Sequence, residues 1–391
     1  MTTYLACVGT RPEIIKIAPV HRALQERGHT VQVLHTGQHE AMAESLYGFF
    51  GIVPDARLQL GRQRPSLAHL TAELLIGVDQ QMQALAPEVV LVQGDTTSAL
   101  VGALVGFYQD LPVAHIEAGL RTGEHDPFPE EKNRALIGRL ASWHFPPTPQ
   151  ARQNLLREGI APDSIHEVGN TVIDAAHWAS AQLRLPRLQQ PMPKDVTDFL
   201  QRQDARSLLL VTAHRRENWG IPMQNIASAV SGLLQLHPDL MVVWPLHPNP
   251  QVRHDVHTAL ASLPVSGRER LCLTEPLDYP AMIGLLQSCR FTLTDSGGLQ
   301  EEASALHTPV LILRESTERQ ELVDAGGARL VGTRAHQIIE EASELLHDPM
   351  LLTAMQIEHS PFGDGHAARR IADVLCARGS CQQESLRRRA A

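Results

Sequence analysis

The sequence predicts an α/β protein with two doubly wound domains, and three observations support this prediction. The chain has 391 residues, about twice the length that one hydrophobic core usually organises. Its apolar fraction is 43% and its charged fraction is 20%, as expected for a globular protein with a substantial core. Short apolar runs alternate with longer amphipathic segments, which indicates parallel strands connected by right-handed helical crossovers.

The first half of the chain contains one such series of elements. Short apolar runs predict strands over residues 4–8, 31–35, 89–92, 113–116 and 165–168. Amphipathic segments between them predict helices over residues 12–28, 67–85 and 98–109.

The second half repeats the pattern after a break. Residues 183–206 are rich in Pro, Gln and Arg, and we expect the two domains to be joined near residues 170–200. New strands are predicted over residues 208–212, 241–244, 291–294, 309–313 and 330–331. A last helix is expected over residues 366–377, where it could pack on either domain, and the arginine-rich end is expected to be a solvated tail.

Composition and charge argue against several classes of protein. The formal charge of −9 and the aromatic fraction of 4% disfavour a nucleic-acid-binding protein and a polybasic membrane anchor. No apolar stretch approaches the roughly 18 residues of a membrane-spanning helix. Five cysteines without paired metal-ligand spacing predict reduced thiols, a cytoplasmic location and no metal site. No Gly-x-Gly-x-x-Gly follows a predicted strand, so no nicotinamide cofactor is expected.

The turn after the first predicted strand has features of an anion-binding site. Ligands of parallel α/β sheets bind beyond the carboxyl ends of the strands. Arg11 and Lys16 lie there in the first turns of a predicted helix, whose free N–H groups and dipole favour an anion. Only three residues of the chain are lysines: Lys16, Lys132 and Lys194. Because lysine is so scarce, we expect Lys16 to bind a ligand and not to be a solvated surface residue.

Acidic residues follow the next strands of the first domain. Asp95 comes after the strand 89–92, although an aspartate here is also a common helix cap. Glu117 ends the strand 113–116, where an unpaired carboxylate is costly to bury. Glu130 lies in the loop that follows. Because parallel strands share one carboxyl edge, we expect these acids to converge and to supply an acid and a base.

The second domain offers a candidate nucleotide site. Ser296, Gly297 and Gly298 follow the strand 291–294, and the glycines would let a phosphate approach the backbone N–H groups of a helix N-terminus. Glu302, about one helical turn later, could accept hydrogen bonds from two ribose hydroxyls.

Two further residues belong to the same predicted edge. His214 follows the strand 208–212 and is a candidate phosphate donor or acid, although a histidine in this place is at least as often structural. Arg319 follows the strand 309–313. Together these residues predict an enzyme that binds a nucleotide diphosphate and uses the acids of its first domain.

Seven motifs together resemble the non-hydrolysing UDP-N-acetylglucosamine 2-epimerase family. They run in order along the chain, and the resemblance extends from about residue 4 to about residue 377. The motifs are GTRPE (9–13), GDT (94–96), EAGLR (117–121), PEE (129–131), GNT (169–171), HRRE (214–217) and DSGGxQEE (295–302).

The resemblance implies a fold and a set of site residues. The fold is of the glycosyltransferase-B type, with two Rossmann-like domains, the ligand in the cleft between them, and a C-terminal helix that crosses back to the first domain. The implied domains are residues 1–170 with the helix 364–391, and residues 171–363. The implied catalytic residues are Asp95, Glu117, Glu130 and His214. The residues implied to bind UDP are Arg11, Lys16, His214, Ser296, Gly297, Gly298, Glu302 and Arg319.

The resemblance also implies the reaction. It is the reversible conversion of UDP-N-acetylglucosamine to UDP-N-acetylmannosamine, by elimination of UDP to a 2-acetamidoglucal and re-addition, for cell-surface polysaccharide synthesis. The resemblance implies that no cofactor or metal is needed. It also implies that the protein is a homodimer and that its ligand is the UDP-sugar substrate.

Three points stay open at the level of sequence. The third carboxylate is aligned with Glu130, but the loop before it is one residue shorter than in enterobacterial relatives, so Glu131 is the alternative. Gln38, His39 and Met42 match an allosteric segment of the family, whereas residues 63–67 depart from its Pro-Gly-Gln pattern. The competing interpretations are an epimerase of a UDP-2,3-diacetamido uronic acid, a glycosyltransferase of the same fold and a catalytically silent nucleotide-sugar sensor.

Overall fold

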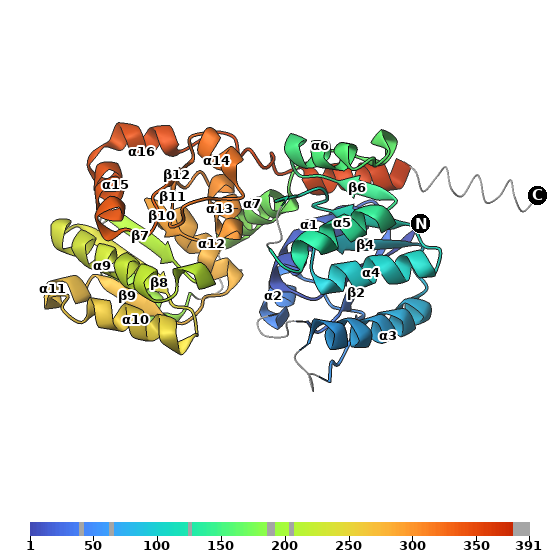
Figure 1. The fold of residues 1–391 in the computed structure, drawn as a ribbon, viewed down its shortest axis with the longest axis horizontal. Coiled ribbons are helices and arrows are strands. Elements are labelled where there is room, and N and C mark those ends of the chain that lie inside the picture. The colour runs from blue at the N-terminus through green and yellow to red at the C-terminus, as the bar shows by residue number, and fades with distance from the viewer. Residues whose placement is uncertain (39–42, 62–65, 124–126, 186–191, 203–206, 378–391) are drawn as a thin grey trace, which may run out of the picture. The chain divides into compact units, whose positions relative to one another are not determined.

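The computed structural model describes residues 1–38, 43–61, 66–123, 127–185, 192–202 and 207–377. The chain forms two compact units (Figure 1). Unit 1 consists of Met1–Ala175 and Phe362–Ala391, and unit 2 consists of Ala176–Pro361. The chain passes from unit 1 to unit 2 inside one helix, α7 (Thr171–Leu183).

Unit 1 is built on a parallel six-stranded sheet flanked by helices (Figure 1). Its strands are β1 (Thr3–Val8), β2 (Thr30–His35), β3 (Ala56–Arg57), β4 (Val89–Gln93), β5 (Val113–Ile116) and β6 (Trp143–Phe145). Its helices are α1 (Arg11–Gln25), α2 (Ala43–Phe50), α3 (Leu67–Leu85), α4 (Thr97–Tyr108), α5 (Glu130–Leu140) and α6 (Pro149–Arg157), with a final helix over 367–377. The central strand β4 is buried along its whole length and β1 from its second residue on, as expected when helices cover both faces of a parallel sheet.

Unit 2 has a second parallel six-stranded sheet with its own apolar core. Its strands are β7 (Ser207–Thr212), β8 (Leu240–Pro245), β9 (Leu271–Thr274), β10 (Phe291–Thr294), β11 (Val310–Ile312) and β12 (Ala328–Leu330). Its helices after α7 are α8 (Lys194–Gln201), α9 (Ile221–Leu236), α10 (Pro250–Leu260), α11 (Val265–Arg268), α12 (Tyr279–Ser288), α13 (Gly297–Ala305), α14 (Gln320–Asp324), α15 (Ala335–His347) and α16 (Pro349–Met355).

The two sheets have the same topology, which decides where a ligand can bind. The strand order is β3-β2-β1-β4-β5-β6 in unit 1 and β12-β11-β10-β7-β8-β9 in unit 2. The order therefore reverses between β1 and β4 in the first sheet and between β7 and β10 in the second. At such a switch point the loops after two neighbouring strands diverge and leave a crevice at the carboxyl edge. The predicted doubly wound α/β fold is confirmed.

Some predicted elements were wrong. The strand expected over 165–168 is a single bridge between His144 and Ile165. The N–H of Val168 donates to the carbonyl of Pro146, but Pro146 has no N–H to return a bond, so no ladder continues. The strand expected over 330–331 lies earlier, at β12. Three short strands, β3, β6 and β9, were not predicted.

The last helix of the chain packs in unit 1, although the sequence pattern alone left its domain open. Asp174 of α7 accepts hydrogen bonds from the backbone N–H groups of Ala367 (3.2 Å) and Ala368 (2.9 Å) and so caps this helix. Nearby, the N–H of Asn170 donates to the carbonyl of Phe362 at 2.7 Å. The two points where the chain changes unit therefore lie side by side.

No helix in the described part of the chain is long and apolar enough to cross a membrane.

Candidate functional site

The N-terminus of α1 is joined to the loop after β4 by a buried glutamate. Glu13 is almost fully buried, and its Oε2 accepts hydrogen bonds from the N–H groups of Gly9 (2.8 Å) and Thr10 (2.7 Å) and from the Thr10 hydroxyl (2.8 Å). Its Oε1 accepts one from the hydroxyl of Thr96 at 2.6 Å. Burial raises the pKa of Glu13 to about 7, against the opposing effect of these donors. Glu13 thereby fixes the loop that carries Asp95.

Glu117 lies at the centre of the polar groups of unit 1. Lys16 Nζ contacts both of its carboxylate oxygens, at 2.6 and 2.7 Å, and both side chains are buried. Gln93 Nε2 donates to the same carboxylate, and Asn170 Nδ2 lies 3.5 Å from it. Glu117 has a φ of 65°, a conformation that non-glycine residues adopt rarely. The expected cost of burying this carboxylate is met by an ion pair.

Asp95 is oriented by the first turns of α5. Arg134 Nε donates to Asp95 Oδ2 at 2.7 Å, and Asn133 Nδ2 donates to the Asp95 carbonyl at 2.8 Å. The alternative that Asp95 caps α4 is wrong, because Thr96 is the N-cap and accepts from the N–H of Ala99.

The adjacent glutamates at the start of α5 have different surroundings. Glu131 is buried and accepts hydrogen bonds from the N–H groups of Thr122 and Gly123 and from Arg134 Nη1 at 3.0 Å. Burial opposes ionisation of Glu131, but these donors together lower its pKa. Glu130 is partly exposed and, within the described residues, forms no side-chain hydrogen bond or ion pair. Glu131 therefore holds the loop in place, and the neighbouring carboxylate stays accessible.

Two other sequence-predicted residues of unit 1 lie near the same loops. Arg11 is the first residue of α1 and is partly buried. Gln38 Oε1 accepts from the N–H and the hydroxyl of Ser98, at 3.2 and 2.7 Å, in the first turn of α4. His39 and Met42, predicted with Gln38 as allosteric, lie outside the described residues, as do residues 62–65.

In unit 2 the N-terminus of α13 is surrounded by positive charge. Ser296 is its N-cap and accepts from the N–H of Leu299 at 3.4 Å. A methyl group at Gly297 would lie 3.5 Å from Arg319 Cζ and 3.6 Å from Arg215 Nη2, so two guanidinium groups lie over the helix terminus. Free N–H groups, a positive dipole end and two arginines together favour a phosphate.

Two adjacent glutamates one turn into α13 differ in burial and in their partners. Glu301 is buried and accepts from Nε and Nη2 of Arg319, both at 2.8 Å, which fixes the guanidinium. Glu302 is partly exposed. Burial, with the Glu302 charge as a smaller contribution, raises the pKa of Tyr279 well above its ordinary value.

His214 lies directly beside this terminus at the switch point of the second sheet. Asp295, the residue before Ser296, accepts from the backbone N–H of His214 at 2.9 Å, and its other oxygen lies 3.4 Å from His214 Nδ1. The imidazole is half exposed and is nearly parallel to the ring of His247, with centroids 6.3 Å apart.

Sequence reasoning placed the main groups but missed their partners. The structure brings Asp95, Glu117 and Glu130 to one edge of the first sheet, and it brings the second set together around α13: His214, Ser296, Gly297, Gly298, Glu302 and Arg319. The missed residues are Glu13, Gln93, Arg134, Arg215 and Asp295. A polar residue at the end of an apolar strand could have indicated Gln93 and Asp295, whereas nothing local marks Arg134.

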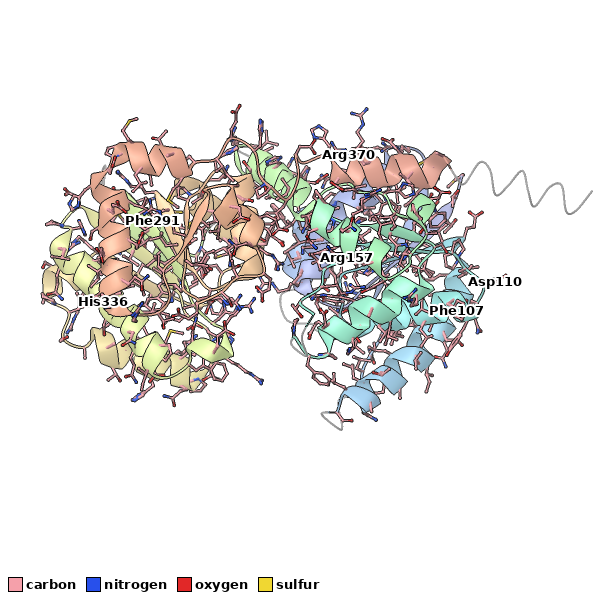
Figure 2. All side chains as sticks on the ribbon, turned by 45° about the horizontal axis from the view of Figure 1, so that its top comes forward. Phe107, Asp110, Arg157, Phe291, His336 and Arg370 are labelled. Atoms are coloured by element: carbon pink, nitrogen blue, oxygen red, sulfur yellow. The ribbon has the colours of Figure 1, made fainter. Side chains whose placement is uncertain are left out.

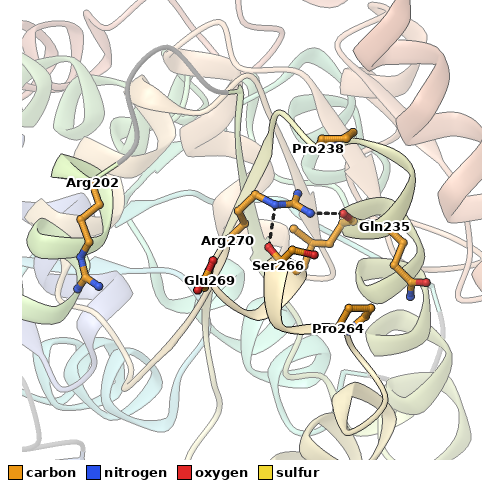
Figure 3. Close-up of a pocket in the computed structure, with 9 residues that line it drawn as sticks. Arg202, Gln235, Pro238, Pro264, Ser266, Glu269 and Arg270 are labelled. Carbon is orange, nitrogen blue, oxygen red and sulfur yellow. Dashed lines mark hydrogen bonds between the residues drawn. The ribbon is translucent and has the colours of Figure 1, made fainter.

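A pocket of unit 2 lies away from these residues. It has a volume of about 850 Å³ and is lined by the end of α9, by α11 with its flanking residues up to Arg270, and by Arg202 at the end of α8 (Figure 3). This is the amino edge of the sheet, opposite His214. Arg270 lines it, but its guanidinium donates to backbone carbonyls such as those of Leu234 and Leu240, so its role is structural.

The fold and the two groups of residues define a class: an α/β protein of two doubly wound units. Carboxylates gather at the carboxyl edge of the first sheet, and a helix N-terminus beside two arginines lies at the carboxyl edge of the second. Among the described residues no group of His, Cys, Asp and Glu could hold a metal ion. The profile of one family, described as UDP-N-acetylglucosamine 2-epimerase, matches residues 22–376.

Individual relatives match over nearly their whole length. The UDP-N-acetylglucosamine 2-epimerase of Escherichia coli K12 is 41% identical over 95% of this chain and 97% of the relative. A probable UDP-N-acetylglucosamine 2-epimerase of Ralstonia nicotianae is 41% identical over 96% of this chain and 99% of the relative. The crystal structure of the Neisseria meningitidis UDP-GlcNAc 2-epimerase bound to UDP-GlcNAc has a TM-score of 0.86 and 38% identity, covering 96% of this chain and 100% of that chain. The chain belongs to the UDP-N-acetylglucosamine 2-epimerase family of enzymes.

Proposed function

We propose that the protein interconverts UDP-N-acetylglucosamine and UDP-N-acetylmannosamine at C2 of the sugar. The observation that carries this proposal is the grouping of Asp95, Glu117 and Glu130 beyond the carboxyl ends of β4 and β5 in the first sheet. Family membership supports the choice of substrate, since a relative 38% identical was crystallised with UDP-GlcNAc.

The chemistry that we propose begins with loss of UDP. A C2 proton beside an acetamido group is far too weakly acidic for a carboxylate with an ordinary pKa of about 4. Breaking the C1–O bond first creates an oxocarbenium-like centre at C1, which acidifies that proton. One carboxylate then takes the proton, giving 2-acetamidoglucal and free UDP. Re-addition of UDP at C1, with a proton delivered to the opposite face of C2, forms the epimer.

We assign the acid–base work to Asp95, Glu117 and Glu130. Arg134 orients the first of them, and Lys16 balances the charge of the second. Glu130 is preferred to Glu131 because the carboxylate of Glu131 is already occupied by backbone N–H groups and Arg134. Lys16 was predicted to bind UDP, but we assign it the role of pairing with Glu117. Arg11 keeps its predicted role as a ligand for the substrate.

We assign UDP binding to unit 2. The N–H groups of Gly297 and Gly298, the Ser296 hydroxyl, His214 and Arg319 would stabilise the departing diphosphate, and Glu302 would accept the ribose hydroxyls. Arg215 is added to this set because its guanidinium lies over Gly297.

The test is incubation of the purified protein with UDP-GlcNAc in D₂O, without acceptor or redox cofactor, followed by NMR. UDP-ManNAc carrying deuterium at C2 is the expected product. Free ManNAc with UDP would indicate a hydrolysing enzyme, and absence of turnover would favour a transferase, a uronic acid epimerase or a sensor.

We also propose that the enzyme is cytoplasmic and supplies precursors for polysaccharide. The described cysteines are all free thiols, in keeping with a reducing compartment.

We propose further that it is a homodimer. Adjacent helices α3, α4 and α5 leave large apolar side chains exposed on unit 1, namely Ile76, Phe107 (labelled in Figure 2), Tyr108 and Leu136. Light scattering of the wild type and of Phe107→Glu tests the dimer, since only the variant should be monomeric.

A further inference from the structure

The loops after β7 and β10 are joined by one buried carboxylate. Asp295 is fully buried, and its Oδ2 accepts hydrogen bonds from the backbone N–H groups of His214 and Arg215, both at 2.9 Å. The same oxygen accepts from Asn218 Nδ2 at 2.9 Å. One oxygen of Asp295 therefore fixes the whole turn that carries His214.

The other oxygen of Asp295 faces the imidazole. Asp295 Oδ1 lies 3.4 Å from His214 Nδ1, and in the described part of the chain it has no hydrogen-bond partner. A buried carboxylate oxygen without a donor is costly, so the environment favours a proton on Nδ1. The remainder of the ring is half exposed, beside the N-terminus of α13.

We propose that Asp295 is a positioning residue that acts through His214. By holding a proton on Nδ1, it leaves Nε2 free to take a second proton from solvent when a phosphate oxygen approaches. The doubly protonated ring then links the buried carboxylate to the diphosphate. The only bond formed is the N–H at Nε2, whose proton comes from an O–H bond of solvent, and no bond between heavy atoms changes. This inference rests on the proposed function for the identity of the ligand, UDP.

The carboxylate should matter beyond its hydrogen bonds to the turn. In Asp295→Asn the amide oxygen can replace Oδ2 and keep all three donors of the turn. The amide nitrogen then faces Nδ1 and donates to it, so the ring carries its one proton on Nε2 and stays neutral. The turn is preserved, but the charge link to the phosphate is lost.

The experiment measures UDP affinity of the full chain by calorimetry in four proteins: wild type, Asp295→Asn, His214→Asn and the double variant. Asp295→Asn should weaken UDP binding by about tenfold or more, the usual size of a lost charge-assisted hydrogen bond. In the His214→Asn background the same change should have little further effect. Asp255→Asn is the matched control, since Asp255 is a buried aspartate of the same unit held by Gln224 and Gln251, and its UDP affinity should equal that of the wild type.

Nitrogen-15 NMR of the His214 ring with UDP bound gives an independent reading, even if Asp295→Asn does not fold. Both ring nitrogens should be protonated in the wild type, and only Nε2 in Asp295→Asn. An equal loss of affinity with and without His214, or a singly protonated ring in the wild-type complex, would overturn the inference. If the Asp295 and His214 substitutions are coupled in UDP binding as expected but UDP-GlcNAc is not turned over in D₂O, only the proposed function is refuted. If the protein does not bind UDP, both the proposed function and this inference are refuted.

Discussion

The adjacent residues Glu130 and Glu131 are assigned different roles, one in catalysis and one in stability, because their contacts differ. Glu130→Gln should lower kcat by about 10²–10⁴-fold, the usual contribution of a placed acid or base, without changing the melting temperature. The reason is that Glu130 lacks a side-chain partner in the described structure. Steady-state kinetics of UDP-GlcNAc epimerisation and thermal unfolding provide the two measurements.

Glu131→Gln is the matched comparison. Loss of the charged acceptor for the N–H groups of Thr122 and Gly123 should reduce the free energy of unfolding by about 1–3 kcal/mol. If Glu131→Gln kept full stability and lost activity while Glu130→Gln stayed active, the assignment of the third carboxylate would have to be reversed.

Glu13 should make stability depend on pH. Its pKa is raised to about 7 by burial, so between the unfolded value and 7 the folded form keeps a proton that the unfolded form has lost. Stability due to this group is therefore present at low pH and is lost as pH rises through that window. Urea unfolding of the wild type and Glu13→Gln should show the variant gaining about 1–3 kcal/mol relative to the wild type from about pH 5 to about pH 8. Parallel pH profiles would contradict this.

Among the elements, the helix over 367–377 depends on a cap supplied from α7. Asp174→Ala removes acceptors for the N–H groups of Ala367 and Ala368 and should reduce the free energy of unfolding by about 0.5–2 kcal/mol. Chemical denaturation measures the change. Asp373→Ala is the control: it breaks an ion pair between the same helix and Arg27, in which the aspartate is exposed, worth less than about 1 kcal/mol. Equal losses in the two variants would show that the buried cap has no special importance.

The elements that sequence could and could not predict differ in their position in the sheets. The central strands β1, β4 and β7 contain continuous apolar runs because helices cover both faces of each sheet. The missed or misplaced strands, β3, β6, β9 and β12, are the four edge strands. An edge strand pairs on one side only and can be as short as the two residues of β3, so its sequence carries little periodic signal.

The site divides in a similar way. Asp95, Glu117 and Ser296 were predictable because each follows a strand at a carboxyl edge, where fold topology alone brings them to a crevice. Arg134 was not, because it meets Asp95 across 39 positions of sequence through the packing of α5. Such contacts depend on how helices pack, which local sequence does not encode.

At the scale of the whole molecule, each unit has its own sheet and core. Residues 171–361 form a continuous segment that includes α7 and the second core. This fragment, expressed alone, should unfold cooperatively and bind UDP, since it contains every residue that we assign to UDP binding in unit 2. Circular dichroism and calorimetry measure both properties, and residues 1–170 alone provide the contrast, since they lack the helix over 367–377 and should be much less stable. An unfolded 171–361 fragment would contradict this division.

The placement of the helix over 367–377 in unit 1 has a consequence for biosynthesis. The sheet of unit 1 leaves the ribosome first, but the helix that completes its packing is translated only after Ala176–Pro361. Unit 2 can therefore finish folding while unit 1 is still incomplete, with the backbone N–H partners of Asp174 not yet made. A chain interrupted anywhere in the second unit would release a first unit with an uncovered apolar face and a carboxylate lacking its partners, a state that cellular quality control can recognise.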